Sequence, residues 1–329
     1  MLYIHNTSND PYFNMASEEY ILKELKEEIF MLWQNSPVIV VGKNQNTIEE
    51  INTNFVNEEN IAVVRRLSGG GAVYHDIGNV NFTYVVSYNN TFFDEFATFT
   101  KPIIETLKEI GIKAELQGRN DISIEGKKFS GNSQVVYKDR VLHHGTIMVD
   151  VNTEVLTKAL KVKSSKIESK GIKSIRKRVT NINEHLTSPI SGLDFLKILE
   201  NHMKAENNLI DYKLTQEELD KINTLASMKY RTYSWNYGKS PSYNFKKEIE
   251  IPAGRIEFHF YIEEGIIKKA DIFGDFFGER DSKDISNALI GIKHSKTQVE
   301  KVFNDFDIDY YFHSLSKDSV PNLVEKLFE

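Results

Sequence analysis

The chain has 329 residues and a mass of 37.9 kDa, and 40% of its residues are hydrophobic, so it can bury one large core and a smaller second one. Its formal net charge of −6 argues against a general nucleic-acid-binding protein, although a local basic patch can still bind phosphate. The chain contains no cysteine, which excludes disulfides, thiolate metal sites and a thiol nucleophile.

The chain shows no sign of export or membrane insertion. Its first ten residues, MLYIHNTSND, lack an apolar core. No apolar run approaches the ~20 residues that are needed to span a bilayer. We therefore expect a cytoplasmic protein that does not bind membranes.

The N-terminal half alternates helical and strand-like patterns. Residues 14–28 place apolar side chains near helical spacing, and residues 29–34 and 37–42 predict short buried strands. Residues 96–112 predict a helix that ends at Gly111. Strand-like runs joined by short turns then predict a β meander over residues 120–151.

The C-terminal half begins with two predicted helices, at residues 195–207 and 215–228. The next segment, residues 230–244, is aromatic and lacks periodicity, which suits a linker or a docking surface. From about Tyr243 onward, alternating strand patterns followed by two helical ones predict a small α+β domain.

The stretch RRLSGGGAVYHDIGN places three consecutive glycines between two strand-forming segments. Glycine weakens a strand, so three in a row indicate a bulge, a sharp bend or a ligand lying against the main chain. A flexible hairpin loop is the alternative, which the β-branched residues on either side disfavour. A dinucleotide-binding fingerprint needs a third glycine where Tyr74 stands, and GKNQNT from Gly42 fails as a P-loop. We therefore expect a ligand-contacting turn of another architecture.

Residues 161–178 form a basic segment, KVKSSKIESKGIKSIRKR, with eight basic residues and one glutamate in an otherwise acidic chain. Such clustering usually marks a solvated face. Gly171 and the repeated Ser-Lys pairs instead suggest a mobile loop that can fold over an anion. Both interpretations stay open at this point.

Lys128 lies near the start of the strand-like run KKFSGNSQ. Regular alternation predicts that Lys128 and Ser130 face one pocket while Phe129 packs on the other side. The alternative is a solvated lysine beside a hairpin turn. His143 and His144 are adjacent, so their side chains should point to opposite faces, and we expect no catalytic zinc there.

Five segments in this order together resemble the lipoate-protein ligase family: RRLSGGGAVYHDIGNVNF, GRND, GKKFSGNSQ, HHGTIMVDVN and KGIKSIRKRVTNI. WNYGKSP and the strands after it resemble that family's C-terminal accessory domain. The resemblance implies an α/β (α+β) fold with a biotin/lipoyl protein ligase-like catalytic domain, a mixed and antiparallel sheet flanked by helices. We expect this domain over residues 1–242, with a linker from about residue 205, and the small α+β accessory domain over residues 243–329.

The resemblance also implies the residues of the site. The main chain at the three glycines would run beside the lipoyl tail and the phosphate of its adenylate, where a Cβ would collide. The basic segment would cover the adenylate. The residues implied for ATP or adenylate binding are Arg66, Gly71, Ala72, Val73, Tyr74, Lys128, Lys170 and Lys173. Those implied for lipoyl binding are Ser68, Gly69, Gly70, His75 and Lys128, and Lys128 is also the implied catalytic residue.

Asp121 is the candidate magnesium ligand. A hard cation near phosphates prefers carboxylate oxygens, and Asp121 belongs to the matched GRND segment. The alternative is an aspartate that caps a turn.

The activity implied is ATP-dependent attachment of lipoate to a lysine of an acceptor protein through lipoyl-adenylate, with Mg²⁺ as cofactor. The acceptors implied are lipoyl domains of 2-oxoacid dehydrogenase complexes and the glycine-cleavage H protein. Nucleic acid is not an expected partner.

The sequence leaves two alternative functions to compare with this one. An ATP-independent lipoyl or octanoyl transferase acts between carrier proteins, but that branch of the fold works through a cysteine thioester, and this chain has no cysteine. A non-enzymatic nucleic-acid binder would use the basic segment, which lacks the interleaved aromatic residues that stack on bases.

Overall fold

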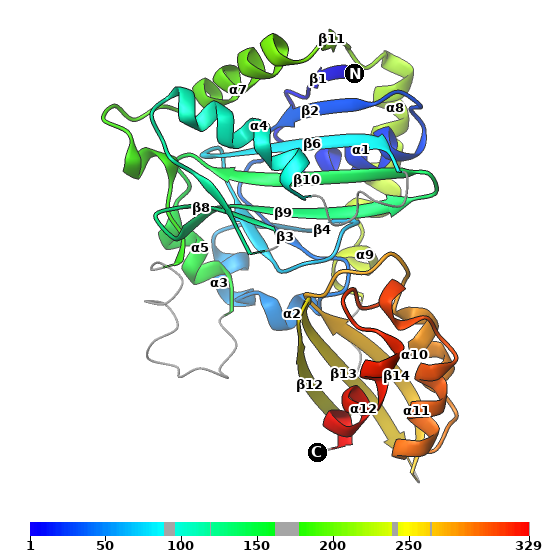
Figure 1. The fold of residues 1–329 in the computed structure, drawn as a ribbon. Helices are drawn as coiled ribbons and strands as arrows, with labels where there is room; N and C mark the ends of the chain where they lie inside the picture. The colour runs from blue at the N-terminus through cyan, green and yellow to red at the C-terminus, as the bar shows by residue number, and fades with distance from the viewer. Residues whose placement is uncertain (89–95, 119, 162–177, 239–242, 264, 329) are drawn as a thin grey trace. The chain divides into compact units, whose positions relative to one another are not determined.

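The computed structural model describes residues 1–88, 96–118, 120–161, 178–238, 243–263 and 265–328. These residues form two compact units (Figure 1). The large unit contains Met1–Val40, Glu50–Arg65 and Val73–Asn236. The small unit contains Tyr237–Glu329 together with two N-terminal segments, Val41–Glu49 and Arg66–Ala72. The sequence patterns did not predict that these two segments pack with C-terminal residues.

The described part of the large unit is built on an eight-stranded mixed sheet with the order β11-β1-β2-β6-β10-β9-β8-β7. Strand β1 pairs in parallel with β11 and β2, and the remaining neighbours pair antiparallel. Its strands are β1 (Leu2–His5), β2 (Ile29–Trp33), β6 (Asn79–Ser87), β7 (Glu115–Gln117), β8 (Asp121–Ile124), β9 (Lys127–Tyr137), β10 (Arg140–Met148) and β11 (Ile210–Asp211). The predicted mixed sheet is confirmed.

A second sheet in the described residues has three strands in the order β4-β3-β5. These are β3 (Val38–Val41), β4 (Ala62–Arg65) and β5 (Val73–His75). Strand β3 consists of four buried β-branched residues, which suits a strand covered on both faces. The strand-forming segments expected on either side of the glycines are confirmed as β4 and β6, and the short strand β5 lies between the glycines and β6.

The helices expected from periodicity are present. Helix α1 begins at Pro11, where the Asp10 side chain accepts a hydrogen bond from the Tyr12 amide at 3.0 Å. Helix α4 is followed by Gly111, whose φ of +84° favours glycine. Through Glu206, the described helices are α1 (Pro11–Lys23), α2 (Thr47–Glu50), α3 (Thr53–Glu58), α4 (Phe96–Glu109), α5 (Thr153–Ala159) and α7 (Gly192–Glu206).

Helix α8 (Gln216–Leu225) leads into a π-helical turn, η4 (Ala226–Tyr230), and then α9 (Tyr233–Tyr237). The aromatic segment that was predicted as an irregular linker therefore contains a short helix. The buried Arg65 side chain accounts for its order, because the Arg65 guanidinium donates to the carbonyl groups of Trp235 and Asn236 at 3.0 and 3.1 Å.

Different helices cover the two faces of the large sheet. His144 Nδ1 lies 2.9 Å from Glu18 Oε1 of α1. His143, the preceding residue of β10, stacks on Phe99 of α4 with ring centroids 4.5 Å apart. Since successive strand residues point to opposite faces, α1 and α4 lie on opposite sides of the sheet. The prediction that the side chains of His143 and His144 point to opposite faces is confirmed.

The hairpin of β8 and β9 contains a bulge. Its turn, Glu125–Gly126, has φ values of +51° and +74°, as a type I′ turn requires. Ile122 pairs with Ser130, but the next residue, Ser123, pairs with Lys128, so Phe129 is an extra residue in β9. Lys128 and Ser130 therefore face opposite sides of the sheet. The prediction that they share a face is wrong because the bulge reverses the alternation.

The small unit has an antiparallel sheet of three described strands, β12 (Phe245–Ile251), β13 (Gly254–Glu263) and β14 (Ile266–Gly274). Helices α10 (Lys283–Leu289), α11 (Lys296–Asn304) and α12 (Val320–Phe328) pack with it around an apolar core that includes Phe258 and Phe303. The two N-terminal segments of this unit are hydrogen-bonded through their backbones. The Gly274 amide donates to Asn44 O at 2.9 Å, and the Lys43 amide donates to Ser68 O at 2.8 Å.

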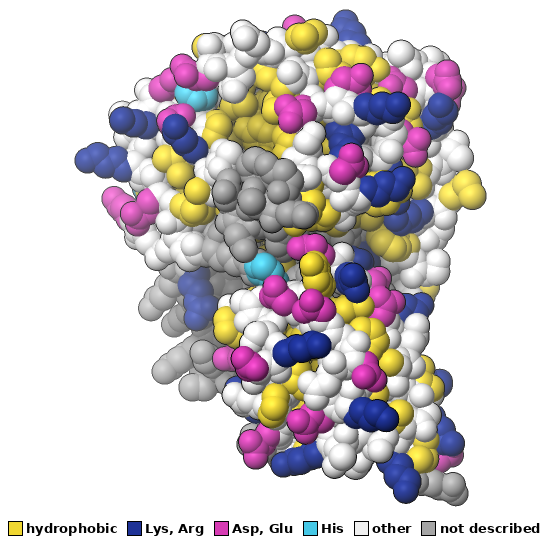
Figure 2. Space-filling view, turned by 45° about the vertical axis from the view of Figure 1, so that its right-hand side comes forward, with side chains coloured by type: hydrophobic (Ala, Val, Ile, Leu, Met, Phe, Trp, Pro, Cys, Tyr) yellow, Lys and Arg dark blue, Asp and Glu magenta, His cyan; other side chains and the backbone are white. Residues whose placement is uncertain are grey.

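The surface in Figure 2 shows lysine and arginine side chains interspersed with acidic ones over the face in view, as is usual for a solvated protein surface. None of the described helices has the length and apolar character needed to cross a bilayer.

Gly145 on β10 provides a test of this packing. A Cβ at Gly145 would lie 2.3 Å from Asn132 Oδ1 and 2.4 Å from the Phe82 ring, whereas a Cβ at Gly126 meets no described atom within 4 Å. We expect Gly145→Ala to lower the free energy of unfolding by about 3 kcal/mol through overpacking. Gly126→Ala adds only backbone strain of about 1 kcal/mol. Denaturant unfolding of both variants checks this order, and a larger loss in Gly126→Ala would contradict it.

Candidate active site

Lys128 and Asp121 form an ion pair across the β8–β9 hairpin. Lys128 Nζ lies 2.7 Å from Asp121 Oδ1, and the two side chains are 38% and 35% exposed. The bulge brings them together, because it turns Lys128 to the face of Asp121 and Gly131. A Cβ at Gly131 would lie 2.9 Å from Lys128 Nζ, so the glycine leaves room for the ammonium group. The pair thus offers a fixed cation next to a carboxylate that solvent can reach.

The two residues that follow the basic segment are tied to the main chain of Lys128. Val179 forms an isolated parallel bridge with Lys128, and the Thr180 amide donates to Lys128 O at 2.9 Å. The predicted adenylate contacts Lys170 and Lys173 lie outside the described residues. A cavity of about 460 Å³ opens beside Val179, and its other lining residues are Val151, Asn152, Thr153, Glu154 and Glu184.

A buried polar group lies on the same face of the sheet as Lys128. Glu18 accepts hydrogen bonds from the Thr83 hydroxyl at 2.6 Å, and its carboxylate lies 2.9 Å from His144 Nδ1. The Trp33 indole N–H donates to Thr83 Oγ1 at 2.9 Å. Glu18 is only 3% exposed. No sequence pattern predicted this group, although an acidic residue within an apolar helical pattern was a usable signal.

Val73, Tyr74 and His75, three of the predicted site residues, form strand β5 in the large unit. They pair with Val40, Ile39 and Val38 of β3. His75 is 3% exposed, and its Nδ1 lies 3.1 Å from Asn35 Nδ2. Burial raises the pKa of Tyr74, and the nearby Asp76 raises it further, so its hydroxyl stays protonated. The Tyr74 hydroxyl therefore offers a neutral hydrogen-bonding group on this strand.

The glycine turn, residues 66–72, belongs to the small unit. Arg66 Nε lies 3.1 Å from Ser68 Oγ and 3.2 Å from Gly69 O, so the Arg66 side chain braces the turn from within. A Cβ at Gly69 would lie 2.5 Å from Phe276 O. Gly70 has φ +88°, and a Cβ there would lie 3.3 Å from the Phe277 ring. Phe276 and Phe277 therefore occupy the space beside Gly69 and Gly70 that a side chain would need.

Gly71 differs from its two neighbours in the glycine turn. A Cβ at Gly71 would meet no described atom within 4 Å. Gly71 also has no positive φ, so its backbone does not itself require glycine. Among the described residues of the turn, this position is open to a ligand.

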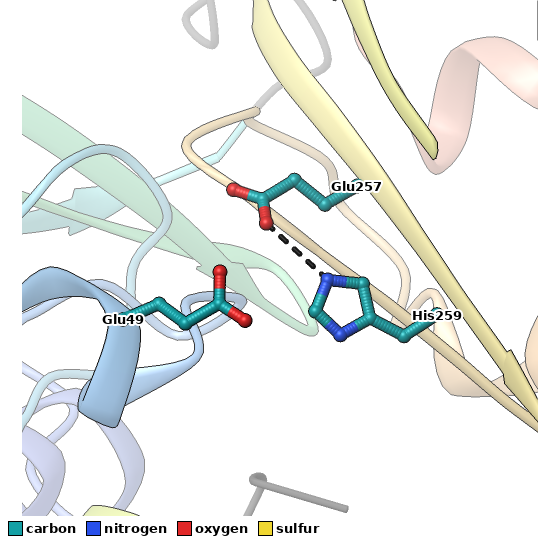
Figure 3. Close-up of side chains that lie close together, drawn as sticks. All are labelled: Glu49, Glu257 and His259. Carbon is teal, nitrogen blue, oxygen red and sulfur yellow. Dashed lines mark hydrogen bonds and ion pairs between the residues drawn. The ribbon is translucent and has the colours of Figure 1, made fainter. Parts of the chain in front are cut away.

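One group of described side chains has the composition of a metal site: Glu49, Glu257 and His259, all in the small unit (Figure 3). Their ligand atoms lie within 4.8 Å of one another. Lys246 forms an ion pair with Glu49 and lies 3.4 Å from Glu257 Oε2, while Arg255 lies 3.1 Å from Glu257 Oε1. Burial favours a higher pKa for Glu49, but the Lys246 hydrogen bond outweighs it and lowers that pKa. The protein's own cations therefore balance these carboxylates.

The predicted site residues are distributed over both units. The structure brings Asp121 and Lys128 together, and it joins Arg66, Ser68 and Gly69 within the glycine turn. Gly70, Gly71 and Ala72 belong to the same turn in the small unit, whereas β5, Asp121 and Lys128 belong to the large unit.

Comparison with known proteins identifies the family. The family model of the lipoyl protein ligase A/B catalytic domain matches residues 10–204, and that of the bacterial lipoate protein ligase C-terminus matches residues 240–324. Lipoate-protein ligase 1 of Staphylococcus aureus is 44% identical over 322 residues, covering 97% of this chain and 98% of the relative. LplJ of Bacillus subtilis, also a lipoate-protein ligase, is 43% identical over 330 residues, covering 98% of this chain and 100% of the relative.

Solved structures support the same assignment. P. falciparum LipL1, whose crystal structure contains lipoate, is 28% identical with a TM-score of 0.77, covering 100% of this chain and 99% of that one. A bipartite lipoate protein ligase from Thermoplasma acidophilum is 25% identical with a TM-score of 0.65, covering 74% of this chain and 98% of that one. The fold, both matched domains and the full-length relatives agree, and the chain belongs to the lipoate-protein ligase family.

Proposed function

We propose that this protein activates lipoate with ATP and transfers the lipoyl group to a lysine of an acceptor domain. The observation that carries the proposal is the Lys128–Asp121 pair, a fixed ammonium and a carboxylate held together at 2.7 Å on one hairpin. The relatives named above are lipoate-protein ligases, and this chain matches them over nearly their whole length, which supports the same activity.

In the first step, an oxygen of the lipoate carboxylate attacks the α-phosphorus of ATP. A carbon–oxygen–phosphorus anhydride forms, and the bond to the leaving pyrophosphate breaks. In the second step, an acceptor lysine amine attacks the carbonyl carbon, an amide forms with loss of a proton, and AMP leaves. Neither step needs a protein nucleophile, which agrees with a chain that has no cysteine.

Lys128 stabilises the charge that develops in both steps. Negative charge grows at the junction of the carboxyl and phosphoryl groups, and an ammonium fixed beside it lowers the barrier. The hydrogen bond with Asp121 holds the Lys128 side chain before substrate arrives.

Magnesium is the proposed cofactor, and Asp121 is its proposed ligand. Asp121 is partly exposed and offers a carboxylate, the ligand type that Mg²⁺ prefers. When bound, Mg²⁺ would neutralise phosphate charge. Asp121 also pairs with Lys128, so the same carboxylate would orient both the Lys128 ammonium and the Mg²⁺ ion.

The remaining substrate contacts are assigned by the family motifs. We propose that Arg66, Gly71 and Ala72 of the glycine turn, with Val73 and Tyr74 of β5, contact ATP or the adenylate, together with Lys170 and Lys173 of the basic segment. The proposed lipoyl contacts are Ser68, Gly69, Gly70 and His75. The open position at Gly71 supports a ligand on the turn.

The proposed acceptors are lipoyl domains of 2-oxoacid dehydrogenase complexes and the glycine-cleavage H protein, in the cytoplasm. We also propose that residues 1–242 carry the catalysis and residues 243–329 form the accessory domain. The absence of cysteine disfavours a thioester-based transferase as the alternative.

Nucleotide dependence tests the proposed reaction. Incubation with lipoate, Mg²⁺-ATP and an apo lipoyl domain should add one lipoyl group to the domain, as read by intact mass. Omission of ATP or Mg²⁺ should abolish the addition, and thiol-blocking reagents on the ligase should leave it unchanged. Transfer from a carrier-bound acyl donor without nucleotide would contradict adenylation.

Gly71→Val tests whether a ligand lies on the glycine turn. An added Cβ meets no described protein atom within 4 Å, so the thermal unfolding midpoint should stay near that of the parent. Lipoate-dependent release of pyrophosphate should be lost because the side chain occupies the ligand's place. Gly291→Ala, at an open position of the small unit outside the glycine turn, is the control and should stay active. Full activity of Gly71→Val would show that the turn is structural.

Lys128→Ala tests the catalytic assignment. Loss of a comparable transition-state donor typically costs about 10² to 10³ in rate. We expect such a fall both for adenylate formation and for transfer from preformed lipoyl-adenylate, with the fold retained. Lys128→Arg should also fail substantially, since a planar guanidinium cannot occupy the same point.

Lys127→Ala is the matched control, because it removes the same charge from the adjacent residue. Lys127 pairs with Ile124 and points to the face opposite Lys128. It should be nearly silent. If Lys127→Ala lowered the rate and Lys128→Ala did not, the catalytic role would belong to Lys127 instead of Lys128.

A further inference from the structure

A chain of buried polar side chains lies behind the hairpin, on the face of the sheet opposite Lys128. Gln134 Nε2 lies 3.0 Å from His143 Nδ1, and His143 Nε2 lies 3.3 Å from Asn132 Oδ1. All three residues are at most 3% exposed. None of these three side chains is bonded to the ion pair of Lys128 and Asp121, and the mechanism above gives them no role.

His143 is neutral in this setting, and its partners fix its tautomer. Burial lowers the pKa of His143 well below its usual value, and the neighbouring His144 lowers it further. The Gln134 amide nitrogen can only donate, so His143 Nδ1 accepts. The proton is therefore assigned to Nε2, which donates to Asn132 Oδ1.

The imidazole in turn fixes the orientation of the Asn132 amide. With Oδ1 directed at His143, the Asn132 Nδ2 group donates to Asn120 O at 3.0 Å. Asn120 Nδ2 donates back to Asn132 O at 2.8 Å, and the Asn132 main-chain amide also donates to Asn120 O at 2.9 Å. If the Asn132 amide were flipped, its oxygen would face the oxygen Asn120 O, and its NH₂ group would face the N–H of His143. Three hydrogen bonds therefore clamp Asn120 to Asn132.

Asn120 immediately precedes Asp121, the partner of Lys128. Residue 120 is where the chain enters β8, so its position sets where the Asp121 carboxylate stands. Asp121 pairs with Gly131, and Asn132 follows Gly131 on β9. The clamp and the ion pair are thus consecutive rungs of one hairpin, with side chains on opposite faces.

We propose that His143 is a positioning residue for catalysis: through Asn132, it locks the entry to β8 and thereby holds Asp121 and Lys128 in reacting geometry. The inference rests on the proposed role of Lys128. The imidazole itself lies on the opposite face from the ion pair and does not touch substrate. A simpler role as aromatic core filler is the competing account, since His143 also stacks on Phe99 at 4.5 Å.

The test is a double-mutant cycle in the full-length chain, with lipoate-dependent pyrophosphate release as the assay. His143→Phe keeps an aromatic ring but removes both hydrogen bonds. We expect kcat to fall by about 10- to 100-fold, since misplacement by about 1 Å can cost that much, with KM for lipoate little changed. His143→Gln keeps an amide donor toward Asn132 and should restore part of kcat.

In the Lys128→Ala background, His143→Phe should change kcat by no more than about twofold, because the group that it positions is already gone. Tyr84→Phe is the control for the buried environment, since Tyr84 lies opposite His143 on β6 and its hydroxyl contacts Met203 instead of the clamp. It should leave kcat unchanged. Near-UV circular dichroism establishes that each variant is folded at the assay temperature.

The outcomes separate the two hypotheses. Equal losses from His143→Phe with and without Lys128 would overturn the positioning role and leave the proposed function standing. An unchanged kcat in His143→Phe would also overturn it. A silent Lys128→Ala would instead refute the proposed role of Lys128, and the inference with it, while the lipoate-dependent activity itself would still be measured.

Discussion

The ion pair of Lys128 and Asp121 is the interaction on which the proposed chemistry depends, and a single extra residue makes it possible. The Phe129 bulge turns Lys128 toward Asp121 and Gly131, whereas an unbulged strand would turn it to the other face. Gly131 leaves space for the ammonium. Bulges are often found next to active sites, where they redirect a side chain.

In the glycine turn, packing within the small unit restricts two positions to glycine. Phe276 O and the Phe277 ring occupy the space that side chains at Gly69 and Gly70 would need, and Arg66 braces the turn through Ser68 and Gly69. A glycine-rich motif can therefore serve protein packing at two positions and leave a third open. The three glycines of this motif need not share one reason for being glycine.

Much of the fold was predictable from the sequence because local patterns determine it. Periodicity gave α1, α4 and α7, alternation gave the meander of β8 to β10, and family motifs pointed to Lys128 and Asp121. The failures concern contacts that are distant in sequence. Nothing in KKFSGNSQ marks Phe129 as an extra residue, because the partner strand sets the register. The Glu18–His144 contact joins residues 126 positions apart.

The most direct test of the central claim is NMR of the lysine ammonium groups, with Lys128 and Lys127 assigned by arginine substitution. Titration with a non-hydrolysable lipoyl-adenylate analogue should shift the Lys128 Nζ resonance strongly and leave that of Lys127 in place, because Lys128 faces Asp121 and Lys127 points to the opposite face. A shift at Lys127 with none at Lys128 would contradict the assignment of the ammonium to the carboxyl–phosphate junction.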